Sequence, residues 1–323
     1  MVQLLPIVPP RRGKFERKTT PLPAFYLADT SDGSRGVWGA VNPESLIKIQ
    51  SPTVGIAPWS SDENSLFHGV YWSESPLPRI LGVIPSEACV TAIPQSDAEE
   101  VRKYLSKVTV CVVGDEARLD AAIAAGESSV PIVLWNANDI SLPWLPCHKV
   151  LRNLEDFRAG WMVCLAREHM FFRDVTFEIA GTSCGASFDS SAAARLLTAC
   201  ETEGVIMLAI TNEGAWRVHT QPGWADGLLE ALHPSLREIA AIQLNHILLA
   251  RGLDLSPQGA SNLEVFHRAE DAVAQLRNGA QVVYLLQPIR SAQLRELIKH
   301  GQMLPANSVA LDVAALEGWQ DAD

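Results

Sequence analysis

The side chains best suited to chemistry lie in a short loop near the middle of the chain. Ser183 and Cys184 carry nucleophilic atoms and stand between two glycines, Gly181 and Gly185. Glycine lets a ligand approach the backbone closely, and free amides at the start of a following helix attract anions. An ordinary β-to-α turn without a ligand is the alternative. The loop predicts a site for a small anion or a nucleotide, with ligand-binding residues Gly181, Thr182, Ser183, Gly185, Ser190 and Ser191.

The same loop raises the question of catalysis. The pattern Gly181-x-Ser183-x-Gly185 has the spacing of a serine-hydrolase nucleophile elbow. In such an elbow the helix starts directly after the serine, whereas residues 186–189 intervene here and no His-Gly-Gly-Gly segment supplies an oxyanion hole. Cys184 would need helix-start amides that lower its pKa and a nearby base, for which His219 is a candidate. Acyl or phosphoryl transfer through Ser183 or Cys184 is thus the alternative to binding alone, and the sequence leaves open whether the protein is an enzyme.

The histidines and cysteines do not show the spacing of a metal site. Cys147 and His148 are adjacent, and Cys164 and His169 form an isolated pair, so neither fits the pattern of zinc ligands. We therefore expect no metal. The six cysteines are scattered without a Cys-x-x-Cys motif, which is typical of reduced, mostly buried thiols in a cytoplasmic protein.

The loop would be positioned by a strand before it and a helix after it. Alternating apolar and polar residues predict a strand over Asp174–Ala180. An alanine-rich helix is expected from about Ser190. Ahead of the strand, helical spacing predicts a helix over residues 156–170 that buries one apolar face, made of Phe157, Trp161, Cys164 and Leu165.

Two strand–helix–strand units and a hairpin predict the rest of the secondary structure. The first unit joins Val108–Val113 through a helix to Val130–Leu134, and a βαβ crossover predicts parallel strands that are neighbours or near neighbours. The second joins Leu263–His267 through a helix to Gln281–Leu286. The turn Thr211–Gly214 between two apolar runs is a hairpin signature.

A long helix is predicted between the hairpin and the second unit. The capping box Ser235-x-x-Glu238 indicates its start, and Gly252 after Arg251 indicates its end. Gln243 and His246 lie three residues apart on this helix and could face a ligand. A histidine on an apolar helix is more often a hydrogen-bonded or surface residue.

Length and pattern together predict the fold class and the domains. A chain of 323 residues corresponds to about two domains, and the proline-rich stretch 143–146 indicates a boundary. We place an N-terminal α/β subdomain at 1–150 and a C-terminal α/β subdomain, with the Gly181–Ser191 loop, at 151–323. The fold class is α/β, more fully mixed α+β, with mixed sheets built from βαβ units and hairpins.

Composition argues against several classes of partner. The net charge of -11 and the pI of about 5.2 argue against a nucleic-acid surface, which needs clustered Lys and Arg. No apolar run approaches the roughly 20 residues of a membrane helix, and the first residues lack the apolar core of a signal peptide. We therefore expect a soluble cytoplasmic protein. The sequence does not encode its oligomeric state in any pattern that we can interpret.

Several short segments, taken in order, resemble one known family. They are Asn42-Pro43, Arg79-Ile-Leu-Gly82, Phe177-Glu-Ile-Ala180, Ala269-Glu-Asp-Ala272, Val283-Tyr-Leu-Leu-Gln-Pro288 and Gly301-Gln-Met-Leu-Pro305 with Ser308. Their order is similar to that of the domain-of-unknown-function-ten-fifteen family, conserved hypothetical proteins related to ParB-like and sulfiredoxin-like serine kinases. The resemblance spans nearly the whole chain.

The resemblance implies a nucleotide-binding, kinase-like protein with a nucleotide and magnesium as the candidate cofactor, although the sequence itself identifies no cofactor. Family members typically follow the strand that corresponds to Phe177–Ala180 with Asp-Gly-His-His-Arg, whereas this chain has Gly181-Thr-Ser-Cys-Gly185. Phosphoryl transfer depends on positioned cations, metal-holding carboxylates and a base. The chain therefore resembles a catalytically degenerate member, a pseudoenzyme that binds a nucleotide or small anion, and phosphoryl transfer by a serine-kinase-like enzyme is the alternative.

Overall fold

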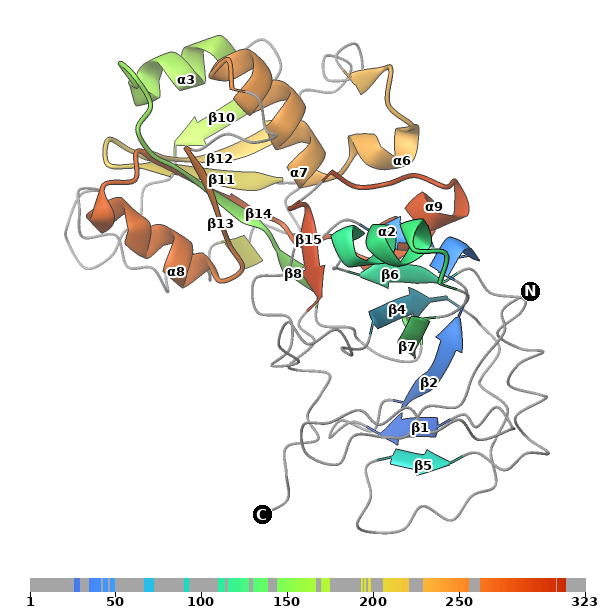
Figure 1. The fold of residues 1–323 in the computed structure, drawn as a ribbon. Coiled ribbons are helices and arrows are strands. Elements are labelled where there is room, and N and C mark those ends of the chain that lie inside the picture. The colour runs from blue at the N-terminus through green and yellow to red at the C-terminus, as the bar shows by residue number, and fades with distance from the viewer. Residues whose placement is uncertain are drawn as a thin grey trace, which may run out of the picture. The chain divides into compact units, whose positions relative to one another are not determined.

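The chain forms two compact units, which are shown as a ribbon in Figure 1. In this computed structural model the first unit contains Met1–Pro143, Ile298–Met303 and Leu311–Asp323, and the second contains Trp144–Leu297 and Leu304–Ala310. The subdomain boundary near residue 150 remains a prediction. The structure describes residues 26–29, 35–41, 43–45, 47–49, 67–72, 90–92, 110–113, 116–127, 130–138, 144–166, 170–174, 193, 195, 197–198, 206–220, 229–255, 262–305 and 307–311.

A seven-stranded sheet forms the centre of the first unit, in the order β3-β6-β4-β7-β2-β1-β5. The pairs β3/β6 and β4/β7 are parallel and the other neighbours are antiparallel. The sheet is therefore mixed, as predicted. Its elements are β1 Tyr26–Asp29, β2 Arg35–Val41, the 3-10 turn η1 Pro43–Ser45, β3 Ile47–Ile49, β4 Phe67–Tyr71, β5 Val90–Ala92, β6 Cys111–Val113, α2 Glu116–Ala124 and β7 Val130–Asn136.

The first predicted βαβ unit exists as elements, but its strand directions were predicted wrongly. β4 lies between β6 and β7, antiparallel to β6 and parallel to β7. β6 and β7 therefore run in opposite directions and are second neighbours. A strand from an earlier part of the chain is inserted between them, and periodicity around α2 contains no information about that long-range partner.

The core of the first unit forms where α2 and the central strands meet. Tyr71, Leu119, Ile132 and Trp135 are all fully buried. The guanidinium carbon of Arg118 lies 4.0 Å from the centre of the Phe67 ring, a cation–π contact that joins α2 to β4.

The second unit is built on a six-stranded sheet in the order β10-β12-β11-β14-β9-β13, in which every neighbouring pair is antiparallel. A separate two-stranded sheet pairs β15 with β8. The strands are β8 Trp144–Pro146, β9 His148–Leu151, β10 Met170–Asp174, β11 Met207–Thr211, β12 Ala215–Thr220, β13 Leu263–Phe266, β14 Val282–Leu286 and β15 Val309–Leu311.

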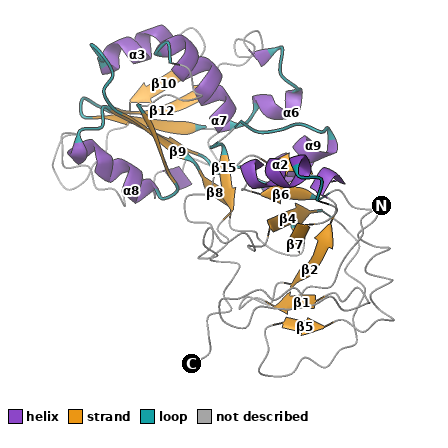
Figure 2. Cartoon of the chain, viewed as in Figure 1, coloured by secondary structure: helices purple, strands orange, loops and turns teal. Residues whose placement is uncertain are grey.

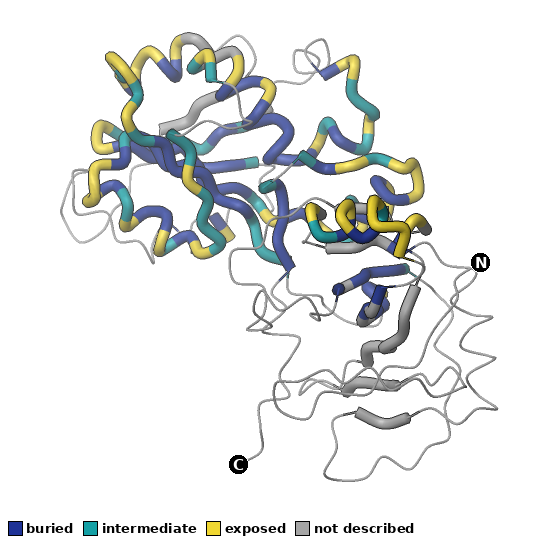
Figure 3. Tube along the Cα trace, viewed as in Figure 1, coloured by how far each residue is buried: buried dark blue, intermediate teal, exposed yellow. Residues whose placement is uncertain are grey.

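Helices cover both faces of the six-stranded sheet, as Figure 2 shows. Figure 3 shows the buried strands between helices whose outer surfaces are exposed. The helices are α3 Ala159–Ala166, α6 Pro234–Arg237, α7 Ala240–Gln243, the π-helix η3 Leu244–Gly252, α8 Ala269–Ala274, the 3-10 turn η4 Gln275–Asn278 and α9 Ser291–Lys299. No helix in the described ranges is long and apolar enough to cross a membrane.

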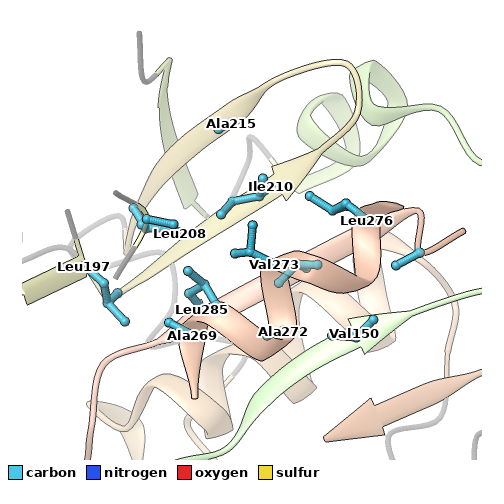
Figure 4. Packing of buried hydrophobic residues seen from close by; sticks show 13 residues of the cluster. Val150, Leu197, Leu208, Ile210, Ala215, Ala269, Ala272, Val273, Leu276 and Leu285 are labelled. Carbon is cyan, nitrogen blue, oxygen red and sulfur yellow. The ribbon is translucent and has the colours of Figure 1, made fainter. Parts of the chain in front are cut away.

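Different helices pack on the two faces of the six-stranded sheet. On one face α8 packs on the central strands (Figure 4); the cluster contains Val150, Ala193, Leu197, Leu208, Ile210, Ala215, Ala269, Ala272, Val273, Leu276, Ala280, Val283 and Leu285. On the other face, the hydroxyl of the fully buried Tyr284 donates to Met162 Sδ of α3 at 2.9 Å. The sheet is thus the middle of three layers, which confirms the predicted α/β class.

The local predictions in the last third of the chain are confirmed. Thr211 Oγ1 accepts hydrogen bonds from the amides of Glu213 and Gly214, at 3.0 and 3.1 Å, and this closes the predicted hairpin between β11 and β12. β13 and β14 are both antiparallel to β9, so they are parallel second neighbours joined by α8, as the second βαβ unit predicts. Gly279 ends η4 with a φ of 87°, a conformation that favours glycine.

The helix predicted over 156–170 is shorter and faces differently. α3 spans only Ala159–Ala166, and Met170 already belongs to β10. Trp161 is 66% exposed and Cys164 is exposed, whereas Met162 and Val163 are buried. The predicted apolar face was therefore wrong, and so was the expectation of a buried thiol at Cys164. The strand begins at Met170, and residues 175–180 of the predicted strand lie outside the described ranges.

The predicted long helix is interrupted. The side chain of His233 accepts from the amide of Ser235 at 3.3 Å and caps α6, so Ser235 lies inside the helix and does not begin it. Pro234 occupies the first turn, where proline is favoured. Ile239 is extended, with φ -84° and ψ 124°, and it separates α6 from α7. The continuation η3 is a π-helix, a form that 3.6-residue periodicity does not predict.

Candidate functional site

The predicted binding loop lies outside the described residues. This applies to Gly181, Thr182, Ser183, Cys184, Gly185, Ser190 and Ser191. Their proposed roles as ligand-binding residues, and those of Ser183 and Cys184 as nucleophiles, therefore remain predictions. The elements before and after the loop are described.

The strand before the loop ends at a defined edge of the sheet. β10 and β11 are both antiparallel to β12, so they run in the same direction, and β9 shares this direction because both β9 and β11 are antiparallel to β14. Asp174, the last residue of β10, therefore stands at the same edge as the carboxyl ends of β9 and β11. Residues 175–192 follow directly.

The helical residues after the loop are fixed against the sheet. Ala193 and Leu197 are buried in the cluster with α8, β11 and β14, and Figure 4 shows Leu197 beside Leu208 and Leu285. The side-chain amide of Gln287 donates to the carbonyl oxygen of Leu197 at 2.8 Å. Gln287 follows the carboxyl end of β14, so Leu197 lies toward the edge opposite Asp174. The chain from β10 to β11 is thus a crossover that begins at the edge where β9, β10 and β11 end.

Three consecutive titratable residues lie at the opposite edge, one just before β9 and two at its start. They are Cys147, His148 and Lys149, and all three are buried. His267, after the end of β13, lies beside them: Cys147 Sγ is 3.8 Å from His267 Nδ1. Such a group of buried ionisable side chains is a candidate functional site on physical grounds.

His148 is held as a neutral imidazole. Its Nδ1 accepts a hydrogen bond from the amide of Leu286 at 3.1 Å, so this nitrogen has no proton and Nε2 carries it. Burial, with smaller contributions from the neighbouring His267 and Lys149, lowers the pKa of His148 from 6.5 to about 3. Protonation of Nδ1 would also break the bond to Leu286.

Lys149 is a buried amine with a carbonyl partner. Its side chain is 1% exposed, and Nζ donates to the carbonyl oxygen of Asn307 at 2.5 Å. Burial lowers the pKa of Lys149 from 10.5 to about 8, and the thiol of Cys147 partly opposes this shift.

The thiol beside His267 is not activated. Burial raises the pKa of Cys147 from 9.0 to about 11, although Lys149 lowers it, so the thiol stays protonated near neutral pH. His267 Nδ1 lies 3.3 Å from the carbonyl oxygen of Pro146, which favours a proton on Nδ1. Its Nε2 is buried without a hydrogen-bond partner among the described residues. A Cys–His nucleophile with a thiolate is therefore not present at this edge.

The titratable side chains in the described ranges do not form a metal site. No group of three or more His, Cys, Asp or Glu there could hold a metal ion. Cys147 and His148 are adjacent on the chain, but His148 Nδ1 is occupied by the Leu286 amide. Cys164 is exposed, and His169 lies outside the described residues.

Gln243 and His246, which the sequence suggested could face a ligand together, differ in burial. Gln243 is buried and its Nε2 donates to the carbonyl oxygen of Arg237 at 2.8 Å, whereas His246 is exposed. They do not share a ligand-facing surface, so that hypothesis was wrong. His219 lies on β12 opposite Phe171, and its predicted partner Cys184 is outside the described ranges.

Sequence reasoning missed Lys149 and His267. Lys149 occupies a four-residue strand that is too short for a clear period, and its burial comes from β13 and β14, which lie more than a hundred residues later. The proximity of Cys147 and His267 also depends on the pairing of β9 with β13. The one local signal was the run of three titratable residues, Cys147, His148 and Lys149.

The described residues form an α/β protein whose second sheet is covered by helices on both faces (Figure 2). No protein-family model and no curated protein matches the chain. Solved structures to which the chain is similar include a free serine kinase in complex with AMP (10% identity, TM-score 0.41, 92% of each chain). They also include a conserved hypothetical protein from Pyrococcus furiosus (11%, 0.40, 85% of this chain and 90% of that one). A third is SbnI with a C-terminal truncation from Staphylococcus aureus (12%, 0.40, 88% and 90%).

Proposed function

We propose that the protein binds a nucleotide or another small anion at the Gly181–Ser191 loop and does not convert it. The observation that supports this most is the path of the flanking chain. β10 ends at Asp174 on the edge that holds the carboxyl ends of β9 and β11, and the next described residues, from Ala193, pack against the sheet. In α/β proteins, the connection between a strand and a following helix is a common position for an anion site, because the first amides of the helix are free.

The residue types in the loop favour an anion. Gly181 and Gly185 leave room for a ligand to approach backbone amides, and Thr182, Ser183, Ser190 and Ser191 add hydroxyl donors. Amides at the start of the following helix would add a favourable dipole. The loop itself contains no lysine or arginine, so binding would rely on hydrogen bonds, as in phosphate sites built from backbone.

The proposed absence of turnover follows from the same residue types. Phosphoryl transfer needs a base, metal-holding carboxylates and cations around the transferred group. Residues 181–191 supply no histidine, lysine or arginine, and their one carboxylate is that of Asp189. The buried titratable residues lie at the opposite edge of the sheet, because His148 and Lys149 begin β9 and Cys147 directly precedes it. Neither edge thus combines a base, a cation and a carboxylate among the residues named.

The alternative is transfer of a phosphoryl group, or an acyl group, by Ser183 or Cys184. It is favoured by the presence of two nucleophilic side chains between the two glycines. In that case a nucleotide with magnesium would be the phosphoryl donor, and groups outside 181–185 would have to hold the metal. The two functions differ in whether the bound nucleotide is recovered unchanged.

A thermal-shift panel with ATP, ADP, CTP and serine, each with and without magnesium, tests the proposal. A nucleotide present at about 100 times its Kd stabilises by about 2.7 kcal/mol, which corresponds to a rise in Tm of several degrees. We expect such a rise for at least one nucleotide with the native chain and with Gly160→Val. Gly160 is a suitable control because it is exposed and a Cβ added there would meet no atom within 4 Å.

The variant Gly181→Val should keep the Tm of the ligand-free protein and lose the rise. Chromatography of the nucleotide after incubation then measures conversion. Unchanged nucleotide together with a Tm rise supports binding alone. Product formation that disappears in Ser183→Ala or Cys184→Ala would establish the enzyme alternative, and the absence of a Tm rise for every nucleotide would contradict nucleotide binding.

A further inference from the structure

A short segment near the end of the chain returns to the second unit. This segment, Leu304–Ala310, is called the strap. Leu304, Ser308, Val309 and Ala310 are buried, and β15 pairs with β8. Ser308 Oγ donates to the carbonyl oxygen of Pro305 at 2.7 Å. Asn307 has a φ of 61°, a left-handed conformation that non-glycine residues adopt at a cost unless neighbouring contacts hold it.

Lys149 fastens this strap to the six-stranded sheet. Its Nζ donates to the carbonyl oxygen of Asn307 at 2.5 Å. An ammonium group has three N–H donors and no acceptor, so a single carbonyl leaves it with less solvation than water would give. A charged amine that is buried without a counter-ion is strongly disfavoured.

The surroundings of Lys149 provide no counter-ion among the described residues. Directly opposite residues on neighbouring strands share a face, and those opposite Lys149 are Tyr284 on β14 and Val265 on β13. Tyr284 is bonded to Met162 of α3, and burial keeps its hydroxyl protonated by raising its pKa. Along the chain the neighbours are the neutral His148 and the protonated thiol of Cys147, whose Sγ lies 3.8 Å from His267 Nδ1. The strap contributes the uncharged Asn307 and Ser308.

We propose that Lys149 is a proton-controlled catch for the strap: the neutral amine holds the strap closed, and the protonated amine releases it locally. β9 cannot move away from the charge easily, because it is hydrogen-bonded to β13 and β14 on both sides. The strap pairs with one described strand, β8, and is otherwise held by the Lys149 contact and by the burial of Leu304, Val309 and Ala310. Opening the strap is therefore the smaller rearrangement that would admit water to an ammonium group.

The direction of the pH dependence follows from linkage. The closed state lowers the pKa of Lys149 to about 8 from 10.5, so it binds the proton less readily than an open state in which the amine is solvated. Protonation therefore favours the open state, and opening increases as the pH falls from about 10.5 towards 8 and then levels off. Between about pH 9.5 and about pH 7.5, the opening equilibrium constant should rise about 20-fold.

Hydrogen exchange of the full chain, measured by mass spectrometry and corrected for the intrinsic rate at each pH, tests this. Peptides that cover the strap should exchange faster than peptides that cover β14 at every pH, and their protection should fall about 20-fold between pH 9.5 and pH 7.5. Lys149→Gln retains a donor for Asn307 but does not titrate, so its strap protection should not depend on pH. Lys299→Met removes an exposed lysine and should behave as the native chain does.

Three results would overturn the proposal. The first is strap protection in the native chain that does not change with pH. The second is equal protection of strap and β14 peptides, which would mean that the strap opens only when the unit unfolds. The third is unchanged pH dependence in Lys149→Gln. If Lys149→Gln does not fold, the first two measurements on the native chain still decide the question.

Discussion

The neutral imidazole of His148 should make the second unit sensitive to acid. Its side chain is 1% exposed, and Nδ1 accepts the Leu286 amide at 3.1 Å. Two variants separate the role of His148 as a hydrogen-bond acceptor from its role as a titratable group. His148→Asn replaces Nδ1 with a side-chain amide oxygen that can accept the hydrogen bond from Leu286, and it removes the titratable group. His148→Leu removes both the titration and the acceptor.

The size of the effect follows from the pKa. A lowered pKa in the folded state, about 3 against 6.5, means that the unfolded chain binds the proton first as the pH falls. Stability from this group is complete above pH 6.5 and is lost progressively down to pH 3. Between about pH 7.5 and about pH 5 the loss is about 2 kcal/mol, at 1.4 kcal/mol per pH unit below the unfolded pKa.

The free energy of opening of β14, measured by hydrogen exchange at these two pH values, is the appropriate assay because β14 lies beside β9. Other groups titrate in the same window, so the relevant quantity is the difference between the native chain and His148→Asn. We expect the native chain to lose about 2 kcal/mol more than His148→Asn does. His148→Leu should be less stable than His148→Asn by about 1–3 kcal/mol at both pH values, because it leaves the Leu286 amide without an acceptor. Equal acid sensitivity of the native chain and His148→Asn would refute the reasoning.

Three further predictions concern packing, reactivity and the Arg152 contacts. Gly69→Ala should destabilise the first unit by about 1–3 kcal/mol, measured by urea unfolding, because a Cβ there would lie 2.8 Å from side-chain atoms of Ile132, Leu134 and Val110; an unchanged midpoint would contradict the packing. Iodoacetamide at neutral pH should label exposed Cys164 and leave Cys147 unlabelled, because burial raises its pKa to about 11; peptide mapping checks this, and rapid labelling of Cys147 would show that it is accessible. Arg152→Ala should lower the free energy of unfolding by about 1–3 kcal/mol, because the Arg152 guanidinium donates to Glu264, to Gln275 and to the carbonyl oxygen of Asn278. Thermal unfolding measures this loss, and a loss below a few tenths of a kcal/mol would mean that these bonds contribute little.

Sequence reasoning was most successful where structure depends on nearby residues. The hairpin at Thr211–Gly214 was predicted from turn chemistry, and the hydroxyl of Thr211 indeed closes it. The α8 crossover between β13 and β14 was predicted from the strand–helix–strand pattern, and Gly279, which has a positive φ, ends the helical segment. In both cases the residues that determine the conformation lie within the element itself.

Sequence reasoning failed where a partner comes from far along the chain. β4 separates β6 from β7 and reverses their predicted relation. The buried face of α3 is made by Met162 and Val163, and Met162 is contacted by Tyr284, 122 residues later. The Lys149–Asn307 contact joins residues that are 158 positions apart. Local periodicity contains none of this information, so the second candidate site could not be predicted.

The most direct test of the proposed function is the hydrogen-exchange footprint of ADP with magnesium on the full chain, at nucleotide concentrations up to about millimolar, where weak sites become occupied. The proposal predicts slower exchange in peptides that cover residues 175–192 and unchanged nucleotide at the end of the experiment. Exchange in those peptides that does not respond to the nucleotide, while the rest of the chain remains folded, would contradict it.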